Sequence, residues 1–141
     1  LGGGGGITTM LRASWMAALL LGASALPALA QAPEGNADNG QRLFNQCRAC
    51  HTVDQGGRNG VSPNLYQVYG RAAGSVAGFN YSPSMRERAA GGLAWNEENL
   101  RSYLADPKVL VPQGRMSFAG FRDNQQSISD VIAYIRRVGG N

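Results

Sequence analysis

The residues whose types and spacing could do chemistry stand together in one short stretch, Cys47-Arg48-Ala49-Cys50-His51. Positions i, i+3 and i+4 of a helical turn project to one side, so both thiols and the imidazole can reach the same bound group. A Cys-x-x-Cys-His sequence is the attachment signal of a c-type haem. Thioether bonds from Cys47 and Cys50 would fix the porphyrin, and His51 would be the proximal ligand of its iron.

Three other kinds of site could use part of this stretch. A thioredoxin-type dithiol has the same cysteine spacing but belongs to a βαβ unit, and no parallel-sheet pattern follows here. A structural zinc ion usually takes four Cys or His ligands, whereas the whole chain has two cysteines and one histidine. A structural disulfide would not need His51. The sequence therefore favours a covalently attached haem.

The elements expected around this motif are short helices. Asn36 is a suitable N-cap for a first helix that runs to about Cys47, with Gly40 and Phe44 on the same face. A glycine inside a helix costs about 1 kcal/mol relative to alanine, so a close helix–helix crossing is a plausible reason for Gly40. Further helices are expected from Ser82-Pro83 to Gly91-Gly92, from Asn96 to Pro107, and from Ser127 to Val138.

The remaining segments are expected to be loops. Residues 53–62 are polar and rich in glycine, and the prolines and Gly114 within residues 107–120 are expected to exclude a regular element there. No convincing alternating strand pattern appears. The predicted fold class is all-α, a small fold of about four to five short helices and loops wrapped round one covalently bound haem.

A sixth iron ligand has few candidates, because His51 is the one histidine of the chain. Outside the N-terminal segment there are two methionines, Met85 and Met116, and Lys108 is a more distant candidate. Met85 lies in a predicted helix, where it is expected to fill core. Met116 lies in the irregular loop well after His51 and is free to come round to the opposite haem face. Its neutral thioether suits a low-spin electron-transfer iron and raises the reduction potential.

Residues 1–30 are expected to be a targeting segment rather than part of the fold. Residues 1–9 precede the first methionine and look like a read-through or cloning remnant. Arg12 then forms a basic region, residues 15–26 are apolar, and Ala28-Leu29-Ala30 supplies small residues before a cleavage site. An uncleaved anchor is the alternative, but this apolar run is shorter than the ~20 residues that span a bilayer. Cleavage after Ala30 would leave residues 31–141 as one periplasmic domain, with no stable membrane span.

Length and charge agree with a small carrier. The chain has 141 residues and a formal net charge of +4. Without Arg12, 12 Lys and Arg stand against 9 Asp and Glu, which gives +3. This mild positive charge differs from the dense clusters of Lys and Arg that bind nucleic acid, so no nucleic-acid partner is expected. Residues 31–141 suffice for one domain with one core, and a monomer is expected.

Several further motifs occur in an order that resembles class I c-type cytochromes, near the branch shared by mitochondrial cytochrome c and small soluble bacterial cytochromes c. The resemblance covers residues 36–138. Besides the haem motif it rests on Gly40 and Phe44, Pro63-Asn64-Leu65, Gly70-Arg71, Phe79-Asn80-Tyr81, Trp95, Leu100 with Tyr103-Leu104, Pro107, Pro112, Met116 and Phe118.

This resemblance implies roles for residues that spacing alone does not single out. The carbonyl of Pro63 would orient the proximal histidine through its other ring nitrogen. Arg71, Tyr81 and Trp95 would surround the haem propionates, and Tyr103 would lie near the methionine sulfur. The first and last helices would cross with Gly40 and Phe44 against Val131 and Tyr134.

Three departures from the family pattern stand out. Where the family usually reads Pro-Gly-Thr-x-Met, this chain reads Pro112-Gln113-Gly114-Arg115-Met116. The threonine that would bond a propionate is therefore missing, and a looser ligand loop is expected. Ser62 replaces a common glycine, and the segment between Tyr81 and Trp95 is a few residues longer than in the mitochondrial proteins.

The function implied by the resemblance is that of a soluble one-electron carrier, not an enzyme. It would shuttle electrons between respiratory or dehydrogenase complexes through one His/Met-ligated haem c, since two filled axial positions leave no open site. Partners would be a cytochrome bc1 complex, a terminal oxidase or a dehydrogenase. A modest basic patch of Lys108, Arg115 and Arg122 either meets these partners or is merely a solvated surface. The alternatives are a haem subunit docked to a periplasmic dehydrogenase, and a peroxidase or gas sensor with a labile methionine.

Overall fold

The computed structural model describes residues 1–6 and 30–139. Its contacts divide the chain into two units, Leu1–Ala30 and Gln31–Asn141. The predicted basic and apolar regions of the leader lie outside the described residues, so leader cleavage after Ala30 stays a prediction. Within the described ranges, no helix has both the length and the apolar character needed to cross a membrane.

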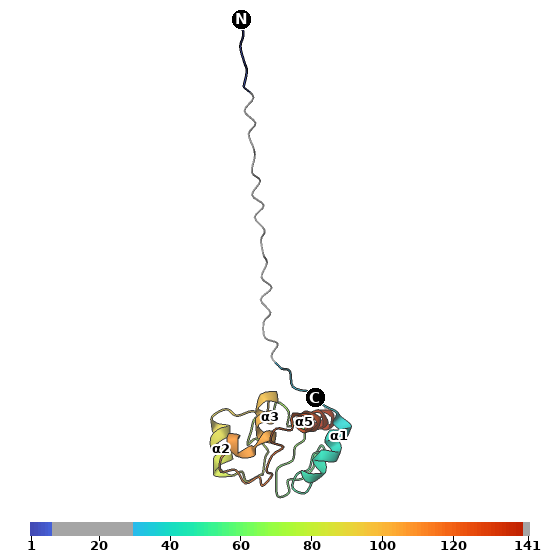
Figure 1. Ribbon diagram of the computed structural model, residues 1–141. Helices are drawn as coiled ribbons and strands as arrows, with labels where there is room; N and C mark the ends of the chain where they lie inside the picture. The colour runs from blue at the N-terminus through green and yellow to red at the C-terminus, as the bar shows by residue number, and fades with distance from the viewer. Residues whose placement is uncertain (7–29, 140–141) are drawn as a thin grey trace. The chain divides into compact units, whose positions relative to one another are not determined.

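The second unit is helical, as the sequence predicts. Over residues 30–139 it contains no strand, and its one isolated β-bridge joins Ala72 and Ala94. The all-α prediction is therefore confirmed. The helices, shown in Figure 1, are α1 (Ala37–Leu43), the 3-10 turn η1 (Phe44–Gln46), α2 (Pro83–Ala90), α3 (Glu97–Ala105), α4 (Pro107–Leu110) and α5 (Gln125–Gly139).

Side-chain caps begin three of these helices where the sequence predicts them. The Asn36 side chain accepts from the N–H groups of Asp38 and Asn39 at the start of α1. Ser82 accepts from the Met85 N–H at α2, and Asn96 caps α3 in the same way. Each cap satisfies backbone donors that have no partner within the helix.

Two helix boundaries differ from the prediction. The first helix stays α-helical only to Leu43, after which the tighter turn η1 continues to Gln46. The last helix begins at Gln125, two residues earlier than expected, because the Asn124 side chain accepts from the Ser127 N–H.

The helix α4 corrects the prediction that no regular element lies between residues 107 and 120. Pro107 ends α3 but also begins α4, because a proline at the first helical position gives up only an N–H that would be unpaired. Asp106 caps this short helix by accepting from the Lys108 N–H at 3.0 Å. A proline thus acts here as a helix start, because the residue directly before it is a cap.

The crossing of α1 and α5 organises the core (Figure 1). Gly40 is buried at this crossing, and a Cβ there would lie 1.9 Å from the Asp130 carbonyl oxygen. The rings of Phe44 and Tyr134 meet beside it with centroids 5.2 Å apart. The predicted close crossing is therefore confirmed. The buried apolar cluster around it comprises Phe44, Val53, Val68, Ala73, Trp95, Leu100, Leu104, Ile128, Val131, Ile132, Tyr134 and Ile135.

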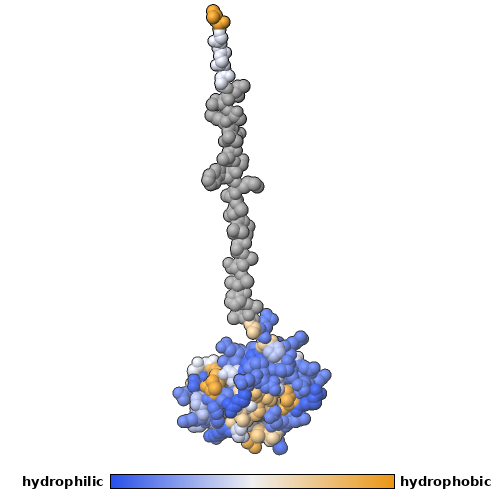
Figure 2. Space-filling model, viewed as in Figure 1, coloured by the Kyte–Doolittle hydropathy of each residue, from blue (hydrophilic) through white to orange (hydrophobic). Residues whose placement is uncertain are grey.

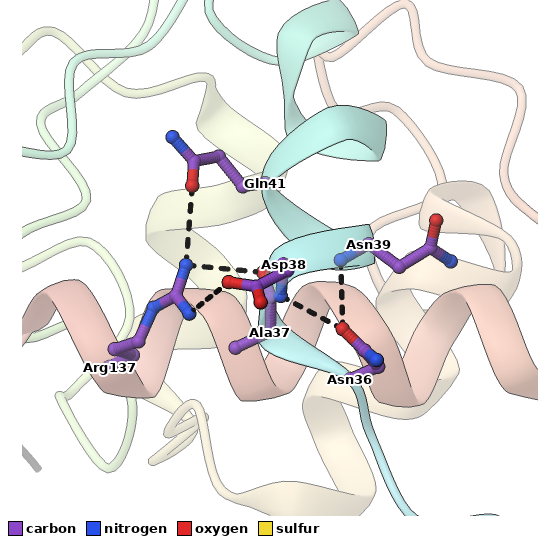
Figure 3. Close-up of polar contacts among 6 residues, drawn as sticks. All are labelled: Asn36, Ala37, Asp38, Asn39, Gln41 and Arg137. Atoms are coloured by element: carbon purple, nitrogen blue, oxygen red, sulfur yellow. Dashed lines mark hydrogen bonds and ion pairs between the residues drawn. The ribbon is translucent and has the colours of Figure 1, made fainter.

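Polar contacts hold the outer edge of the same crossing, as Figure 3 shows. The Arg137 guanidinium donates to an Asp38 carboxylate oxygen at 2.6 Å and to the Gln41 side chain at 3.2 Å. Both partners of the ion pair are substantially exposed, so solvent screens this pair and it contributes little to stability. The apolar contact beneath it carries the larger share of the stabilisation.

Asp130 is a buried carboxylate at the inner edge of this crossing, with 1% of its surface exposed. It accepts from the Asn36 N–H and the Gln126 amide, each at 2.8 Å, and from the Asn39 side-chain amide. Burial alone would raise the pKa of Asp130, but these hydrogen bonds lower the pKa below its ordinary value of 3.8. The charged form thus ties the segment before α1 to α5.

The stability of the fold should therefore depend on the ionisation of Asp130. Because its folded pKa is lowered, its contribution is complete above about pH 4 and is lost as the pH falls through the folded value. We expect Asp130→Asn to lower the free energy of unfolding by about 2 kcal/mol at neutral pH, since one amide proton must face other donors. Urea unfolding of both proteins between about pH 3 and pH 7 measures this. Parallel pH profiles for the two proteins would contradict the assignment.

Candidate functional site

The haem-attachment motif forms a single helical turn that continues directly from η1. The N–H of His51 donates to the Cys47 carbonyl at 2.9 Å, and the N–H of Cys50 donates to the same oxygen at 3.1 Å. The Arg48 N–H bonds back to the Phe44 carbonyl at 3.1 Å. The motif is thus anchored to a buried ring of the α1–α5 crossing, in the geometry that the i, i+3, i+4 spacing predicts.

His51 is half-buried, and one of its two ring nitrogens is engaged by the protein. Its Nδ1 lies 2.7 Å from the Pro63 carbonyl oxygen. A carbonyl only accepts, so Nδ1 carries the proton and Nε2 keeps its lone pair. Burial lowers the pKa of His51, as does the charge of Arg71, while the bond to Pro63 raises it. The structure therefore presents a neutral, oriented imidazole, the form that binds a metal.

The two thiols are free and half-buried. Burial, and then the proximity of Cys50, raises the pKa of Cys47 to about 11. Redox-active dithiols work instead through a thiolate of depressed pKa. The protonated thiol at Cys47 is therefore unlike a thioredoxin-type site.

Two of the three residues expected near the propionates, Arg71 and Trp95, lie on segments that are bonded to one another. Arg71 donates to the carbonyls of Tyr66 at 2.8 Å and Asn64 at 3.0 Å. Trp95 is bonded through its backbone to Arg71, its N–H lying 2.9 Å from the Arg71 carbonyl oxygen. The hydroxyl of Tyr81 accepts from the Val76 N–H at 3.1 Å. Arg71 thereby fixes the chain directly after Pro63, the residue that orients the histidine.

Tyr103 packs against Trp95, with ring centroids 4.8 Å apart. Burial raises the pKa of Tyr103 to about 12, so its phenol stays protonated at any physiological pH. Two of the aromatic residues expected at the site therefore lie in contact.

Comparison with known proteins agrees with this geometry. Residues 37–139 match the family described as Cytochrome c. The chain is 41% identical over 118 residues to cytochrome c2 of Blastochloris viridis, and the aligned region covers 84% of this chain and 87% of that protein. It is 47% identical over 93 residues to cytochrome c2 iso-2 of Magnetospirillum fulvum, covering 66% of this chain and 92% of that protein. The chain belongs to the cytochrome c family.

A solved structure agrees with the fold. Cytochrome cH from Methylobacterium extorquens superposes with a TM-score of 0.66 at 36% identity, covering 73% of this chain and 99% of that protein. Cytochromes c are electron-transfer proteins that bind one covalent haem c, so the cofactor expected from the motif is confirmed at the level of the family. The donor set fits this cofactor, because two free thiols and an oriented neutral imidazole lie on one turn.

Met116 lies half-buried in the loop between α4 and α5. Met85, the other candidate ligand, packs against the core from α2, as predicted. Both ends of the Met116 loop are anchored: Val111 is 1% exposed, and the Phe121 N–H bonds the Leu104 carbonyl at 2.8 Å. The placement of Met116 at the iron stays a prediction that this anchored loop supports.

Sequence reasoning missed several residues that hold the site together. The side-chain amide of Asn64 donates to the Thr52 hydroxyl at 2.8 Å and to the Asp54 carbonyl at 3.0 Å, which joins the beginning of the 53–62 loop to the segment that follows it. The position of Asn64 beside Pro63 could have pointed to it. Lys108 and Arg115, expected at a docking patch, instead donate to backbone carbonyls of Gly114 and Asn80. Nothing in their spacing predicts those contacts.

Proposed function

We propose that this cytochrome c is a soluble, periplasmic one-electron carrier whose haem is attached through Cys47 and Cys50 and ligated by His51 and Met116. The observation that carries the proposal is the turn of Cys47, Cys50 and His51 with the histidine held by the Pro63 carbonyl at 2.7 Å. When bound, the haem supplies an iron that gains and loses one electron. The chain orients the imidazole, excludes water with aromatic side chains and provides a thioether.

The remaining site residues support this role through the haem periphery. Arg71 is partly buried, and burial lowers its pKa, yet guanidinium remains charged in proteins. It is therefore suited to offset a propionate charge, with Tyr81 and Trp95 on neighbouring segments. Tyr103, kept neutral by burial, can donate a hydrogen bond toward the methionine sulfur. With His51 and Met116 both ligating it, the iron would have no free position for a substrate, so no enzymatic activity is proposed.

Covalent attachment is the first property to test. We expect periplasmic expression with haem-maturation machinery to give a red protein whose haem remains with the polypeptide after denaturation and acid–acetone extraction, because thioether bonds survive acid. Cys47→Ser with Cys50→Ser is the matched control, which should release haem into the solvent or fail to mature. Colour that extracts from the unaltered protein would disprove the attachment.

The docking surface has few free charges. Figure 2 shows one face of the protein with mixed hydrophilic and apolar areas, and two large apolar side chains of the second unit, Val61 and Val109, are 81% and 67% exposed. Within the proposed basic patch, Arg122 is paired with Asp106 at 2.7 Å. Of the three patch residues, only Lys108 and Arg115 have no carboxylate partner, so electrostatic steering of a redox partner to this patch should be weak.

We therefore expect the association rate with a cytochrome c oxidase to fall only a few-fold between about 0.01 M and 0.15 M ionic strength. Stopped-flow oxidation of the reduced protein measures this. Reduction by an uncharged small molecule, which should not respond to salt, is the control. A rate independent of ionic strength would favour an apolar contact around Phe118 instead.

A further inference from the structure

The loop that carries Met116 lacks the threonine of the common family pattern, yet it is not free. Gly114 lies within a tight turn, in which its N–H bonds the Val111 carbonyl at 3.0 Å. A Cβ at Gly114 would lie 3.0 Å from a Val111 methyl carbon and 3.2 Å from the Val111 carbonyl oxygen. The turn is therefore closed too tightly for a larger residue to fit without a shift. The Gly114 carbonyl accepts from a side chain outside this turn.

That partner is Lys108. Its ammonium group donates to the Gly114 carbonyl, across the segment from α4 to the turn. The backbone of Lys108 is fixed in its own right, because Asp106 accepts from its N–H at 3.0 Å. Lys108 is also the single lysine of the chain, whose other basic residues are all arginine.

Two weaker contacts reach the same loop from the other side. Arg115 donates to the Asn80 carbonyl at 3.2 Å, and the Gln113 N–H lies 3.4 Å from the Ser84 hydroxyl oxygen. Both partners belong to the segment around α2. The two residues before Met116, Gly114 and Arg115, are thus each bonded to a different part of the fold, and a charged side chain is the donor in both bonds.

We propose that Lys108 is a positioning residue for the axial methionine, which keeps the Met116 loop closed by holding the Gly114 carbonyl. This inference rests on the proposed His/Met ligation. It assigns Lys108 a role within the protein rather than at a partner surface. Loss of the bond should let the loop open more often and expose the iron to other ligands, without removing any iron ligand.

The test uses the haem-loaded protein and the rate at which added imidazole replaces methionine on the ferric iron. That replacement has to wait for the loop to open. We expect Lys108→Ala to retain the weak methionine–iron absorbance band at the red end of the spectrum and to bind imidazole roughly fivefold faster, as loss of one exposed charge-assisted bond implies. Lys108→Arg should restore a rate within about twofold of the unaltered protein, because it keeps a charged donor.

Arg88→Ala is the matched control. Arg88 is exposed on α2 and lines the same surface groove as Pro112 and Gln113. The Arg88→Ala change therefore removes one positive charge near the loop. Its imidazole rate should not change. Equal rates in Lys108→Ala and Arg88→Ala, or a Lys108→Arg protein that behaves like Lys108→Ala, would overturn the proposal. If the unaltered protein itself lacks the methionine–iron band, the proposed ligation fails. The spectrum of the unaltered protein therefore separates failure of the ligation from failure of the role proposed for Lys108.

Discussion

Replacing Met116 with alanine should convert this cytochrome c from a closed electron carrier into an open haem protein. We expect loss of the methionine–iron absorbance band, because the thioether is the proposed sixth ligand. The reduction potential should fall by on the order of 0.1–0.3 V, a fraction of the roughly 0.8 V that axial ligands span, since the neutral thioether favours the reduced iron. Optical spectra and a redox titration of the purified holoprotein measure both effects.

The same variant also tests whether ligation is what prevents chemistry. An open sixth position can bind peroxide or a small gas, so peroxidase activity should rise in Met116→Ala. Such a rise would explain why the unaltered protein is proposed to be a carrier and not an enzyme. An unaltered protein that already turns over peroxide at the rate of the variant would instead favour the labile-ligand alternative.

Met85→Ala is the control for the ligand assignment. Met85 is partly buried and packs against the core from α2, so its truncation should cost about 2 kcal/mol of unfolding free energy, at the low end for a methionine-to-alanine change. Its absorbance band and potential should stay as in the unaltered protein. Loss of the band in Met85→Ala but not in Met116→Ala would reverse the assignment of the ligand.

How far the sequence predicts this site depends on the range of the interactions involved. The turn of Cys47, Cys50 and His51 is local, so the helical spacing specifies it and the structure agrees. The contact of His51 with Pro63 spans twelve residues, and it could be expected only from the resemblance to a known family. Periodicity and capping rules contain no information on such a contact.

The comparison of two prolines shows how the same local signal can be interpreted in opposite ways. Ser82-Pro83 predicts a cap and a first helical residue, and α2 begins there. Asp106-Pro107 has the same chemistry, but it follows a helix, and Pro107 there predicts a helix end. The structure uses it as both the end of α3 and the start of α4. A cap before a proline should be weighed even when a helix has just ended.

The contacts that hold the ligand loop could not be predicted from the chain. Arg115 and Asn80 are 35 positions apart, and their bond depends on how α2 and the loop pack. Lys108 and Gly114 are closer, six positions apart, yet α4 had to be known before the ammonium could be placed. The sequence leaves open whether exposed cations flanking a functional loop dock a partner or are merely solvated, and it cannot distinguish either from a charge that holds a backbone carbonyl.

Gly40 is a position at which a small substitution should have a large effect on the fold. A Cβ there would lie 1.9 Å from the Asp130 carbonyl oxygen and 2.5 Å from its carbonyl carbon. Both atoms belong to the backbone of α5, which cannot move as a side chain can. Gly40→Ala must therefore push α1 away from α5 and loosen the Phe44–Tyr134 contact that adjoins the haem-attachment turn.

We expect Gly40→Ala to lower the unfolding free energy by at least about 2 kcal/mol. Overpacking against backbone should cost about 3 kcal/mol or more, and the better helix propensity of alanine returns only about 1 kcal/mol. Gly91→Ala is the matched control, since a Cβ at Gly91 meets its nearest atom at an ordinary 3.4 Å and the backbone φ is −78°. That change should be neutral or stabilising by up to about 1 kcal/mol, through the lower entropy of the unfolded chain. Urea unfolding of the three holoproteins, followed by far-ultraviolet circular dichroism, gives both differences. Equal stability of the two variants would mean that α1 and α5 do not cross through Gly40.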